Sequence, residues 1–365
     1  MRVLGLSSYP VEAAATRFRL AQFVEPLSEL GIELDIRPFL NRDQFTNMYA
    51  PGRSVEKMLG VVPAAFRRMS LIGSVRNYDL LLVQREAMFF GPAVFEWLYR
   101  AVGRMPMVLD LDDATYVRYV SPSYGQLASR LKFFGKTDNL IRSSTVVSCG
   151  NRYIADHVES LGTKAVVIPT VVPTDVFRPS EKQNAVPVVG WIGTHSTFPF
   201  LKWLFPVLES LAKKHRFQLR IVGAGVNDMS LAGIEVVNLP WELDREVEDF
   251  QSIDIGLYPM TLSASASHDW LMGKSGFKGI QYMAVGVPFV MSPIGVTAEL
   301  GEPGTTHFNA TTHEDWYTHL DKLLSDEDLR SRMGKAGRQY SLNKFTVGRQ
   351  AEILANTLRG AARKL

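Results

Sequence analysis

The sequence has one cysteine, Cys149, among its 365 residues. A single cysteine excludes an internal disulfide and a zinc site built on cysteines. We therefore expect a reducing compartment, the cytoplasm. No run of about 18 apolar residues occurs, so no membrane-crossing helix is expected. The short apolar start of the chain is typical of a first buried strand and too short for the core of a signal peptide.

A strong charge of either sign is also missing, because the net charge is only +3. No nucleic-acid partner is therefore expected. Residues 53–76 differ from the rest, since they hold five basic residues and one acid among apolar ones. This pattern is typical of an amphipathic surface that lies on anionic lipid, here the inner face of a membrane. It is equally typical of a helix pair with a solvated basic face, so both interpretations stay open.

Apolar runs rich in β-branched residues alternate with helical patterns in both halves of the chain. Such runs indicate parallel strands that are buried on both faces of a sheet. Two series of them predict an α/β chain with two Rossmann-like, doubly wound domains. The strands expected in the first domain are 3–6, 33–36, 80–83, 107–111, 145–148 and 165–168; those in the second are 188–192, 218–222, 235–237, 253–258 and 288–291.

A proline-rich segment, 169–187, separates the two series and has no helical period. We expect an N-terminal domain over 1–178, a second domain over 179–340, and a helix over 341–365 that can pack back on the first domain. Ligands of open α/β sheets bind beyond the carboxyl ends of the strands. Two such domains facing each other would place a site in the cleft between them.

The most informative segment is 273–288, which predicts a glycine-bracketed loop and a helix start. The free N–H groups and the dipole of a helix N-terminus suit a phosphate. Lys274 and Lys278 are four residues apart, a spacing that puts both on one helix face toward a diphosphate. Gln281 follows on the same side and can bond a ribose hydroxyl. The same residues also fit a solvent-facing basic helix start.

Two glycine-containing turns follow strands of the second domain. Gly193, Thr194 and His195 come after 188–192, and such residues allow close backbone approach and hydrogen bonds to phosphate or sugar. Gly223 and Gly225 come after 218–222 and would lie beside the nucleobase or ribose. Both segments are also typical of ordinary turns between a strand and a helix.

Charged residues follow the strands of the first domain. Asp110, Asp112 and Asp113 close its fourth expected strand, and three carboxylates there cannot all be buried unpaired. Asp112 and Asp113 are candidates for bonding sugar hydroxyls or steering an acceptor, although an Asx turn explains them as well. Arg17 and Arg19 follow the first strand, where arginines suit a phosphate or carboxylate. Arg17 and Arg19 also fit the exposed surface of an ordinary helix.

The stretch from Trp270 to Gly295 carries a specific resemblance. It runs Gly-Lys-Ser-Gly-Phe-Lys, then Gln-Tyr-Met-Ala, then Gly-Val-Pro. It resembles the signature of retaining glycosyltransferases of family 4, which have the GT-B fold. Further segments that resemble this family occur at 17–19, 84–86, 110–114, 254–259, 292–295 and 328–338.

This resemblance implies a glycosyltransferase with retention of configuration, no required metal and no cofactor. A UDP- or GDP-sugar donor is expected on the second domain, and a saccharide, lipid-linked or small-molecule acceptor on the first. The implied catalytic residues are Asp112, Asp113 and Lys274, and the implied contacts to acceptor or phosphate are Arg17, Arg19 and Arg85. The implied donor contacts are Gly193, Thr194, His195, Gly223, Gly225, Lys274, Ser275, Lys278 and Gln281.

Two features of the family are missing. Its Glu-x7-Glu motif would place glutamates at Gly273 and Gln281, and its arginine–lysine pair would fall within 193–198, which holds no arginine. We hypothesise that Lys274 and Lys278 supply the phosphate-binding charge instead. Two other functions stay open: a non-catalytic protein that binds a nucleotide sugar or glycan, and a nucleotide-sugar epimerase.

Overall fold

The computed structural model describes residues 1–49, 54–117, 133, 135–181, 184–226, 229–262 and 267–363, without the side chains of 48–49 and 54–59. The chain forms two compact units. The N-terminal unit comprises Met1–Thr170, Gly273–Ser275 and Val347–Leu365, and the C-terminal unit comprises Val171–Met272 and Gly276–Thr346. The chain therefore leaves the N-terminal unit and returns to it twice.

The N-terminal unit contains a parallel six-stranded sheet in the order β2-β1-β3-β4-β5-β6. β1 has β2 on one side and β3 on the other, so the strand order reverses at β1. In parallel sheets such a reversal marks the usual ligand-binding edge. The strands are β1 (Arg2–Ser7), β2 (Glu33–Pro38), β3 (Leu80–Gln84), β4 (Met107–Leu111), β5 (Val146–Cys149) and β6 (Ala165–Val167).

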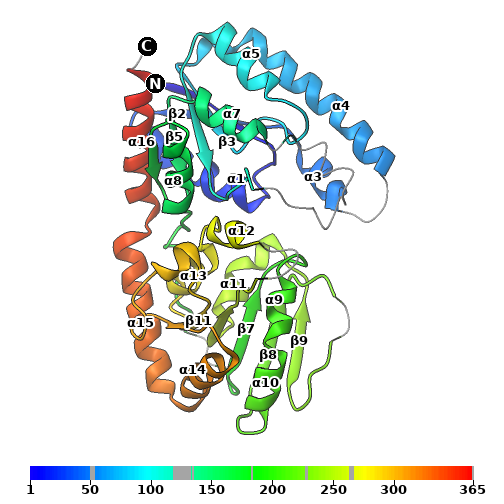
Figure 1. Cartoon of the computed structure of the whole chain (residues 1–365), viewed down its shortest axis with the longest axis vertical. Coiled ribbons are helices and arrows are strands. Elements are labelled where there is room, and N and C mark those ends of the chain that lie inside the picture. The colour runs from blue at the N-terminus through cyan, green and yellow to red at the C-terminus, as the bar shows by residue number, and fades with distance from the viewer. Residues whose placement is uncertain are drawn as a thin grey trace. The chain divides into compact units, whose positions relative to one another are not determined.

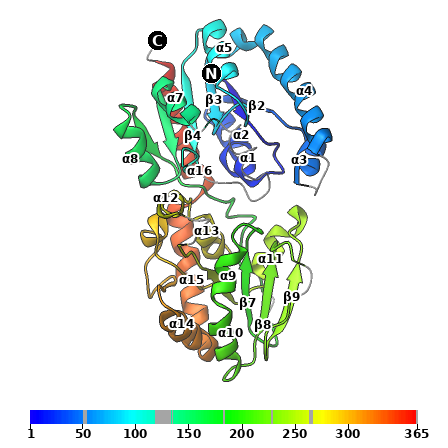
Figure 2. The ribbon, with the colours of Figure 1, turned by 45° about the vertical axis from the view of Figure 1, so that its right-hand side comes forward.

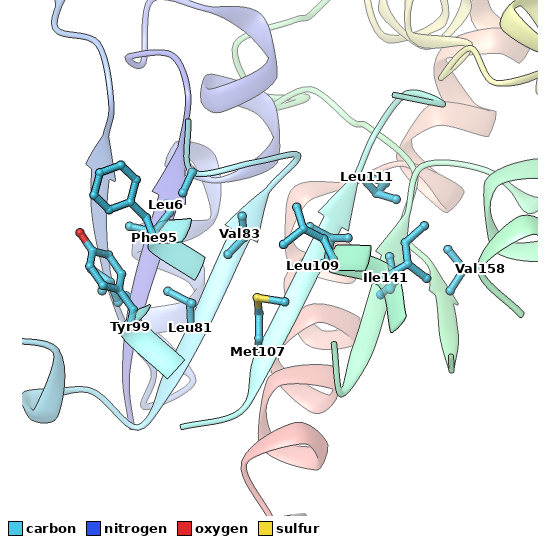
Figure 3. Packing of buried hydrophobic residues seen from close by; sticks show 14 of the residues in the cluster. Leu6, Leu81, Val83, Phe95, Tyr99, Met107, Leu109, Leu111, Ile141 and Val158 are labelled. Atoms are coloured by element: carbon cyan, nitrogen blue, oxygen red, sulfur yellow. The ribbon is translucent and has the colours of Figure 1, made fainter. Parts of the chain in front are cut away.

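Helices cover both faces of this sheet (Figures 1 and 2). On one face, Leu81, Val83 and Leu109 of the strands pack with Tyr99 of α5 and Val158 of α8 (Figure 3). α16 contacts β3, β4, β5 and α2. The helices are α1 (Ala14–Arg19), η1 (Ala21–Phe23), α2 (Val24–Glu29), α3 (Arg42–Tyr49), α4 (Ser54–Ser70), η2 (Leu71–Gly73), η3 (Val75–Asn77), α5 (Val94–Gly103), α7 (Gly135–Ser143), α8 (Arg152–Ser160) and α16 (Val347–Ala362).

The C-terminal unit contains a second parallel six-stranded sheet, in the order β12-β11-β10-β7-β8-β9. Here the order reverses at β7, which lies between β8 and β10. The strands are β7 (Val188–Ile192), β8 (Gln218–Val222), β9 (Glu235–Leu239), β10 (Ile255–Tyr258), β11 (Phe289–Met291) and β12 (Phe308–Asn309). The expected pair of Rossmann-like sheets is therefore confirmed.

The C-terminal sheet also packs against helices. One core joins Leu219 and Ile221 of β8 with Leu208 of α10 and Trp316 of α14, all buried. Tyr282 of α13 donates from its hydroxyl to the carbonyls of Gly190 (3.2 Å) and Leu257 (3.3 Å). The helices are α9 (Phe198–Trp203), α10 (Phe205–Ala212), η4 (Leu243–Arg245), α11 (Glu246–Gln251), α12 (His268–Met272), α13 (Phe277–Ala284), η5 (Gly295–Ala298), α14 (His313–Ser325) and α15 (Glu327–Lys344). Among the described helices, none is long and apolar enough to span a bilayer.

Candidate functional site

A charged cluster lies where the neighbouring strands β3 and β4 end. The Arg85 guanidinium donates to both oxygens of Asp112, from Nε at 2.6 Å and from Nη2 at 2.7 Å. Nη2 also donates to Oδ2 of Asp113 at 3.1 Å. The Gln84 amide adds a bond of 3.2 Å to Oδ1 of Asp112. The structure thus brings together three of the predicted site residues.

The two carboxylates of this cluster have different environments. Asp112 is buried, and burial raises its pKa, but the charge and hydrogen bonds of Arg85 outweigh burial and hold the pKa below its ordinary value. Asp112 therefore stays ionised and has both oxygens engaged by Arg85. The Asp113 side chain is 29% exposed and contacts Arg85 through one oxygen. Asp113 is accordingly the carboxylate of the pair that a ligand can reach.

Arg85 has an unusual backbone conformation. Its φ is +60°, in the left-handed region that a residue with a side chain adopts at a cost of about 1–2 kcal/mol. Its N–H donates to the carbonyl of Asp110 at 2.8 Å, which ties the end of β3 to β4. Backbone strain of this kind concentrates at functional sites, where surrounding bonds maintain it. The strain supports a functional role for the cluster.

The loop Gly273–Ser275 completes this cluster within the N-terminal unit. Nζ of Lys274 lies 3.5 Å from Oδ2 of Asp113, and the carbonyl of Lys274 accepts from the amide of Asn151 at 2.9 Å. A Cβ on Gly273 would lie 2.2 Å from the Cβ of Ala114, so only glycine fits there. Ser275 is half-buried in the same loop. Sequence reasoning missed Asn151, which also caps α8 by accepting from the Ile154 N–H (2.9 Å).

The other two predicted arginines lie elsewhere in the N-terminal unit. Arg19 is 2% exposed and bonds both oxygens of Asp110, the Ile168 carbonyl and the Ser148 hydroxyl. This burial argues against the expected contact to acceptor or phosphate and gives Arg19 a structural role. Arg17 is half-buried in the last turn of α1, where Nη1 donates to the Glu12 carbonyl at 2.9 Å.

The prediction that Lys274 and Lys278 share one helix face is wrong. α13 begins at Phe277, and Lys274 lies in the loop between α12 and α13. Gly276 precedes the helix with a φ of +66°, and this left-handed residue interrupts any helix that includes both lysines. Lys278, in contrast, is in the first turn of α13, near the positive end of the helix dipole.

Lys278 and Gln281 are connected, as their spacing predicts. Nζ of Lys278 donates to Oε1 of Gln281 at 2.9 Å, and Nε2 of Gln281 donates to Oε1 of Glu246 at 3.4 Å. Gln281 is fully buried and Glu246 is 5% exposed, so the amide has no surface that a ribose reaches in this arrangement. Sequence reasoning missed Glu246. It is the first residue of α11, where an acidic residue is too common to be noticed.

Glycines and polar residues meet where β7 and β8 end. The Gly193 N–H donates to the Val222 carbonyl at 3.0 Å, and a Cβ on Gly223 would lie 2.3 Å from the Gly193 oxygen. Gly225 has a φ of +70°, and a Cβ there would lie 3.4 Å from the Cβ of His195. The structure therefore brings Gly193, His195, Gly223 and Gly225 together, and Thr194 and His195 are exposed.

An aromatic cluster beyond the end of β1 was not foreseen. Tyr9 stacks on Phe89 with ring centroids 5.9 Å apart and meets Phe45 edge-on at 5.6 Å. Phe90 lies 4.4 Å from Phe89. The Ser8 hydroxyl, next to Tyr9, donates to the carbonyl of Glu86 at 2.9 Å, and Glu86 directly follows Arg85, so the cluster lies beside the charged residues. These aromatics come from segments 36 to 80 residues apart, so no local pattern reveals them.

The chemistry of the two strand-end regions differs. The N-terminal region combines paired carboxylates, cations and aromatic faces, which suit hydroxyl groups and sugar rings. The C-terminal region offers glycine turns, hydroxyls, a histidine and a helix N-terminus, which suit an anion and its sugar. Within the described parts of the chain, no group of three or more His, Cys, Asp or Glu side chains is arranged to hold a metal.

Comparison with known proteins gives this geometry a context. Residues 186–326 match the family model of the glycosyl transferases group 1. This part of the chain is a glycosyl transferases group 1 domain. It spans the strand-end turns of β7 and β8, the loop Gly273–Ser275 and the whole of α13. No curated protein matches the chain in sequence.

Solved structures resemble the whole chain, including the glycosyltransferase domain. HepE from Anabaena in complex with UDP and glucose aligns with a TM-score of 0.67 at 15% identity, over 99% of this chain and 100% of that one. A glycosyltransferase from Rickettsia africae aligns with a TM-score of 0.68 at 14% identity, over 100% and 99%. The sucrose-phosphate synthase of Thermosynechococcus elongatus gives 0.66 at 14%, over 99% and 98%. The expected GT-B fold is thereby confirmed.

Proposed function

We propose that this protein transfers a sugar from a nucleoside-diphosphate sugar to an acceptor hydroxyl, with retention of configuration and without a metal. The glycosyl transferases group 1 domain over residues 186–326 carries the proposal. HepE, which has the same fold, binds UDP, glucose and UDP-glucose. We propose a UDP- or GDP-sugar as the donor here.

Apart from Lys274, the proposed donor contacts belong to the C-terminal unit. The turns at Gly193 and Gly223 allow a ligand to approach the backbone, while Thr194 and His195 offer exposed hydrogen-bonding groups. Lys278 and the N-terminus of α13 supply positive charge for the diphosphate. Lys274, three residues before α13, supplies a second cation. Together these groups would stabilise the charge that develops on the leaving diphosphate.

The proposed acceptor contacts lie in the N-terminal unit. Asp113 would accept a hydrogen bond from the acceptor hydroxyl, and Arg85 and Asp112 would hold it in position. The half-buried Tyr9 and Phe90 next to this cluster present aromatic faces on which a sugar ring can stack. In the retaining transfer, an oxygen of the donor phosphate takes the acceptor proton. The protein then needs to supply alignment and charge stabilisation and no strong base.

The experiment that tests the proposal is a thermal-shift panel of UDP, GDP, dTDP, CDP and ADP and their sugar conjugates. One nucleotide family is expected to raise the melting temperature of the protein, because a ligand that binds only the folded state stabilises it. Lys274→Ala is expected to lose most of that rise, while Lys214→Ala, at a surface ion pair with Asp321, keeps it. A panel without any shift would count against the proposal.

A binding protein without turnover is the second candidate. The observation that favours it is the replacement of the two family glutamates by Gly273 and Gln281, together with the burial of Gln281. Hydrolysis of the bound donor, measured by release of nucleoside diphosphate, separates the two. Turnover supports the transferase, and tight binding without release over hours supports the binding protein. Conversion of the donor sugar into its epimer would instead indicate an epimerase.

A further inference from the structure

The helix α4 presents an apolar face that nothing in the described structure covers. Val62, Phe66 and Met69 are exposed by 52%, 70% and 48%. Their spacing of four and three residues puts them on one side of the helix. The opposite side, with Ala64 and Arg68, packs into the N-terminal unit. The exposed residues are therefore additional to the apolar side that the fold uses.

Arg68 anchors this helix firmly. Its guanidinium is buried and donates to the carbonyls of Arg37 (2.7 Å), Ser7 (2.8 Å) and Ala87 (2.9 Å). The carbonyl of Arg68 in turn accepts from the Tyr99 hydroxyl of α5. Arg68 is therefore not part of a solvated basic face, which was one of the two interpretations left open for residues 53–76. A helix fixed in this way holds its apolar face outward, and both views show α4 along the outer side of the N-terminal unit (Figures 1 and 2).

The charges within this stretch of the chain all have one sign. Residues 60–78 contain three arginines and no acidic residue. Arg67 and Arg76 are exposed at the surface. Each donates part of its guanidinium to the protein: Arg67 from Nη2 to Gln44 (2.8 Å) and Arg76 from Nε to the Val102 carbonyl (3.3 Å), which leaves their other nitrogens to face a ligand. The neighbouring helix α5 exposes Val94 and Trp97, by 47% and 68%. Exposed apolar side chains and cations in one helical stretch are typical of segments that enter the boundary between lipid headgroups and acyl chains, a depth at which tryptophan is enriched.

We propose that α4 lies on an anionic lipid surface and inserts Val62, Phe66 and Met69 into it. Arg67 and Arg76 contact the lipid phosphates, and insertion of the apolar side chains supplies most of the affinity. This surface goes beyond the proposed transfer reaction and does not depend on it. Residue 53 lies outside the described residues, as do the side chains of 54–59, so the proposal rests on residues 60–76.

The test is sedimentation of the full chain with vesicles of phosphatidylglycerol and phosphatidylcholine, compared with phosphatidylcholine alone. Binding is expected to be stronger to the anionic vesicles and to persist in part at about 0.5 M salt, where surface charges are screened. Phe66→Ser is expected to weaken binding roughly tenfold, because a large apolar side chain no longer inserts. Val62→Asp is expected to weaken it at least as much.

Val176→Asp is the matched control, because Val176 is 50% exposed and lies in the C-terminal unit. It is expected to bind vesicles like the parent protein. Melting temperatures check that every variant folds. Nucleotide-induced shifts of the melting temperature test the transferase proposal, independently of vesicle binding. Equal binding by the parent, Phe66→Ser and Val62→Asp would overturn the proposal. So would a parent dimer that ignores vesicles and becomes a monomer with Phe66→Ser, since a second copy would then cover the face.

Discussion

At the scale of single residues, Asp113 is the group with two opposing roles. It pairs with Lys274 at 3.5 Å, so a diphosphate that uses Lys274 must compete with this carboxylate. We expect Asp113→Asn to bind the nucleoside diphosphate about fivefold more tightly, because a partly exposed ion pair of about 1 kcal/mol no longer competes. The same variant is expected to lose at least ~tenfold in transfer rate, because the acceptor hydroxyl loses its carboxylate.

Calorimetric titration and a product assay measure the two effects. Asp321→Asn removes the same charge from a surface pair with Lys214 and serves as the control. It should change neither quantity. If Asp113→Asn bound nucleotide more weakly than the parent, the competition between Asp113 and phosphate would be disproved.

A second residue links the stability of the C-terminal unit to pH. His307 is fully buried and stacks on Phe289, and burial lowers its pKa to about 4. Between that value and the ordinary value near 6.5, the unfolded chain binds a proton that the folded chain does not. The free energy of unfolding therefore falls as the pH is lowered through this range, by about 3 kcal/mol in full, and is level above it.

Urea unfolding between pH 4.5 and 7.5 measures this slope. His307→Gln is expected to flatten it, since glutamine does not titrate. His313→Gln replaces an exposed histidine at the start of α14 and should leave the slope as it is. A parent protein whose stability is level from pH 7.5 to 4.5 would contradict the prediction.

At the scale of elements, the turn after β8 depends on the absence of a side chain. Gly223 has a φ of +81°, and its Cβ would lie 2.3 Å from the Gly193 oxygen. Gly233 has a similar φ of +74°, yet its Cβ would lie 3.5 Å from the nearest atom, in Ala212. Both alanine variants pay the left-handed cost of about 1 kcal/mol. Only Gly223→Ala also forces the ends of β7 and β8 apart.

We therefore expect Gly223→Ala to lose at least ~3 kcal/mol of stability and most of its nucleotide binding. Gly233→Ala should lose about 1 kcal/mol and keep its binding. Denaturant unfolding and the thermal-shift panel measure both. Equal losses in the two variants would show that the contact with Gly193 has no energetic role.

The elements also show what the sequence was able to predict. All eleven expected strands are present, most within one or two residues, because buried parallel strands are short runs of β-branched residues. β12 was missed, since a strand of two residues has no pattern. The prediction that Lys274 and Lys278 share a helix face was wrong for a local reason. Gly276 has a left-handed conformation, so α13 begins only at Phe277, after Lys274.

Long-range pairing explains the remaining differences at the site. Arg19 is paired with Asp110, 91 residues later, so nothing next to either residue reveals that both are buried. The same holds for Gln281. Its position on the same side as Lys278 was predicted, but its amide also donates to Glu246, which lies 35 residues earlier in the chain. Sequence reasoning finds residues that follow strands, and the fold decides which of them face inward.

At the scale of the whole molecule, the N-terminal unit depends on the last part of the chain. α16 places Leu354 and Leu358 against elements of this unit, both buried. We expect Leu358→Ala to cost about 3 kcal/mol, because it leaves a cavity beside the sheet. The control is Leu342→Ala in α15, where the side chain is 37% exposed and the loss should stay below about 1 kcal/mol.

Amide hydrogen exchange locates the effect. Leu358→Ala is expected to speed exchange in β3, β4 and β5, which α16 contacts, and to leave β7 to β11 unchanged. Faster exchange confined to the C-terminal unit would show that α16 does not stabilise the sheet of the N-terminal unit.

The return of the chain to its first unit also matters while the protein is being made. Residues 1–170 emerge from the ribosome long before 347–362, so β3, β4 and β5 wait without their α16 cover during synthesis of everything between. The C-terminal unit contains no residue after Thr346, so all of it has been synthesised before α16. We therefore expect the N-terminal unit to reach its final packing only after the C-terminal unit has been synthesised, and to expose the sheet surface under α16 until then.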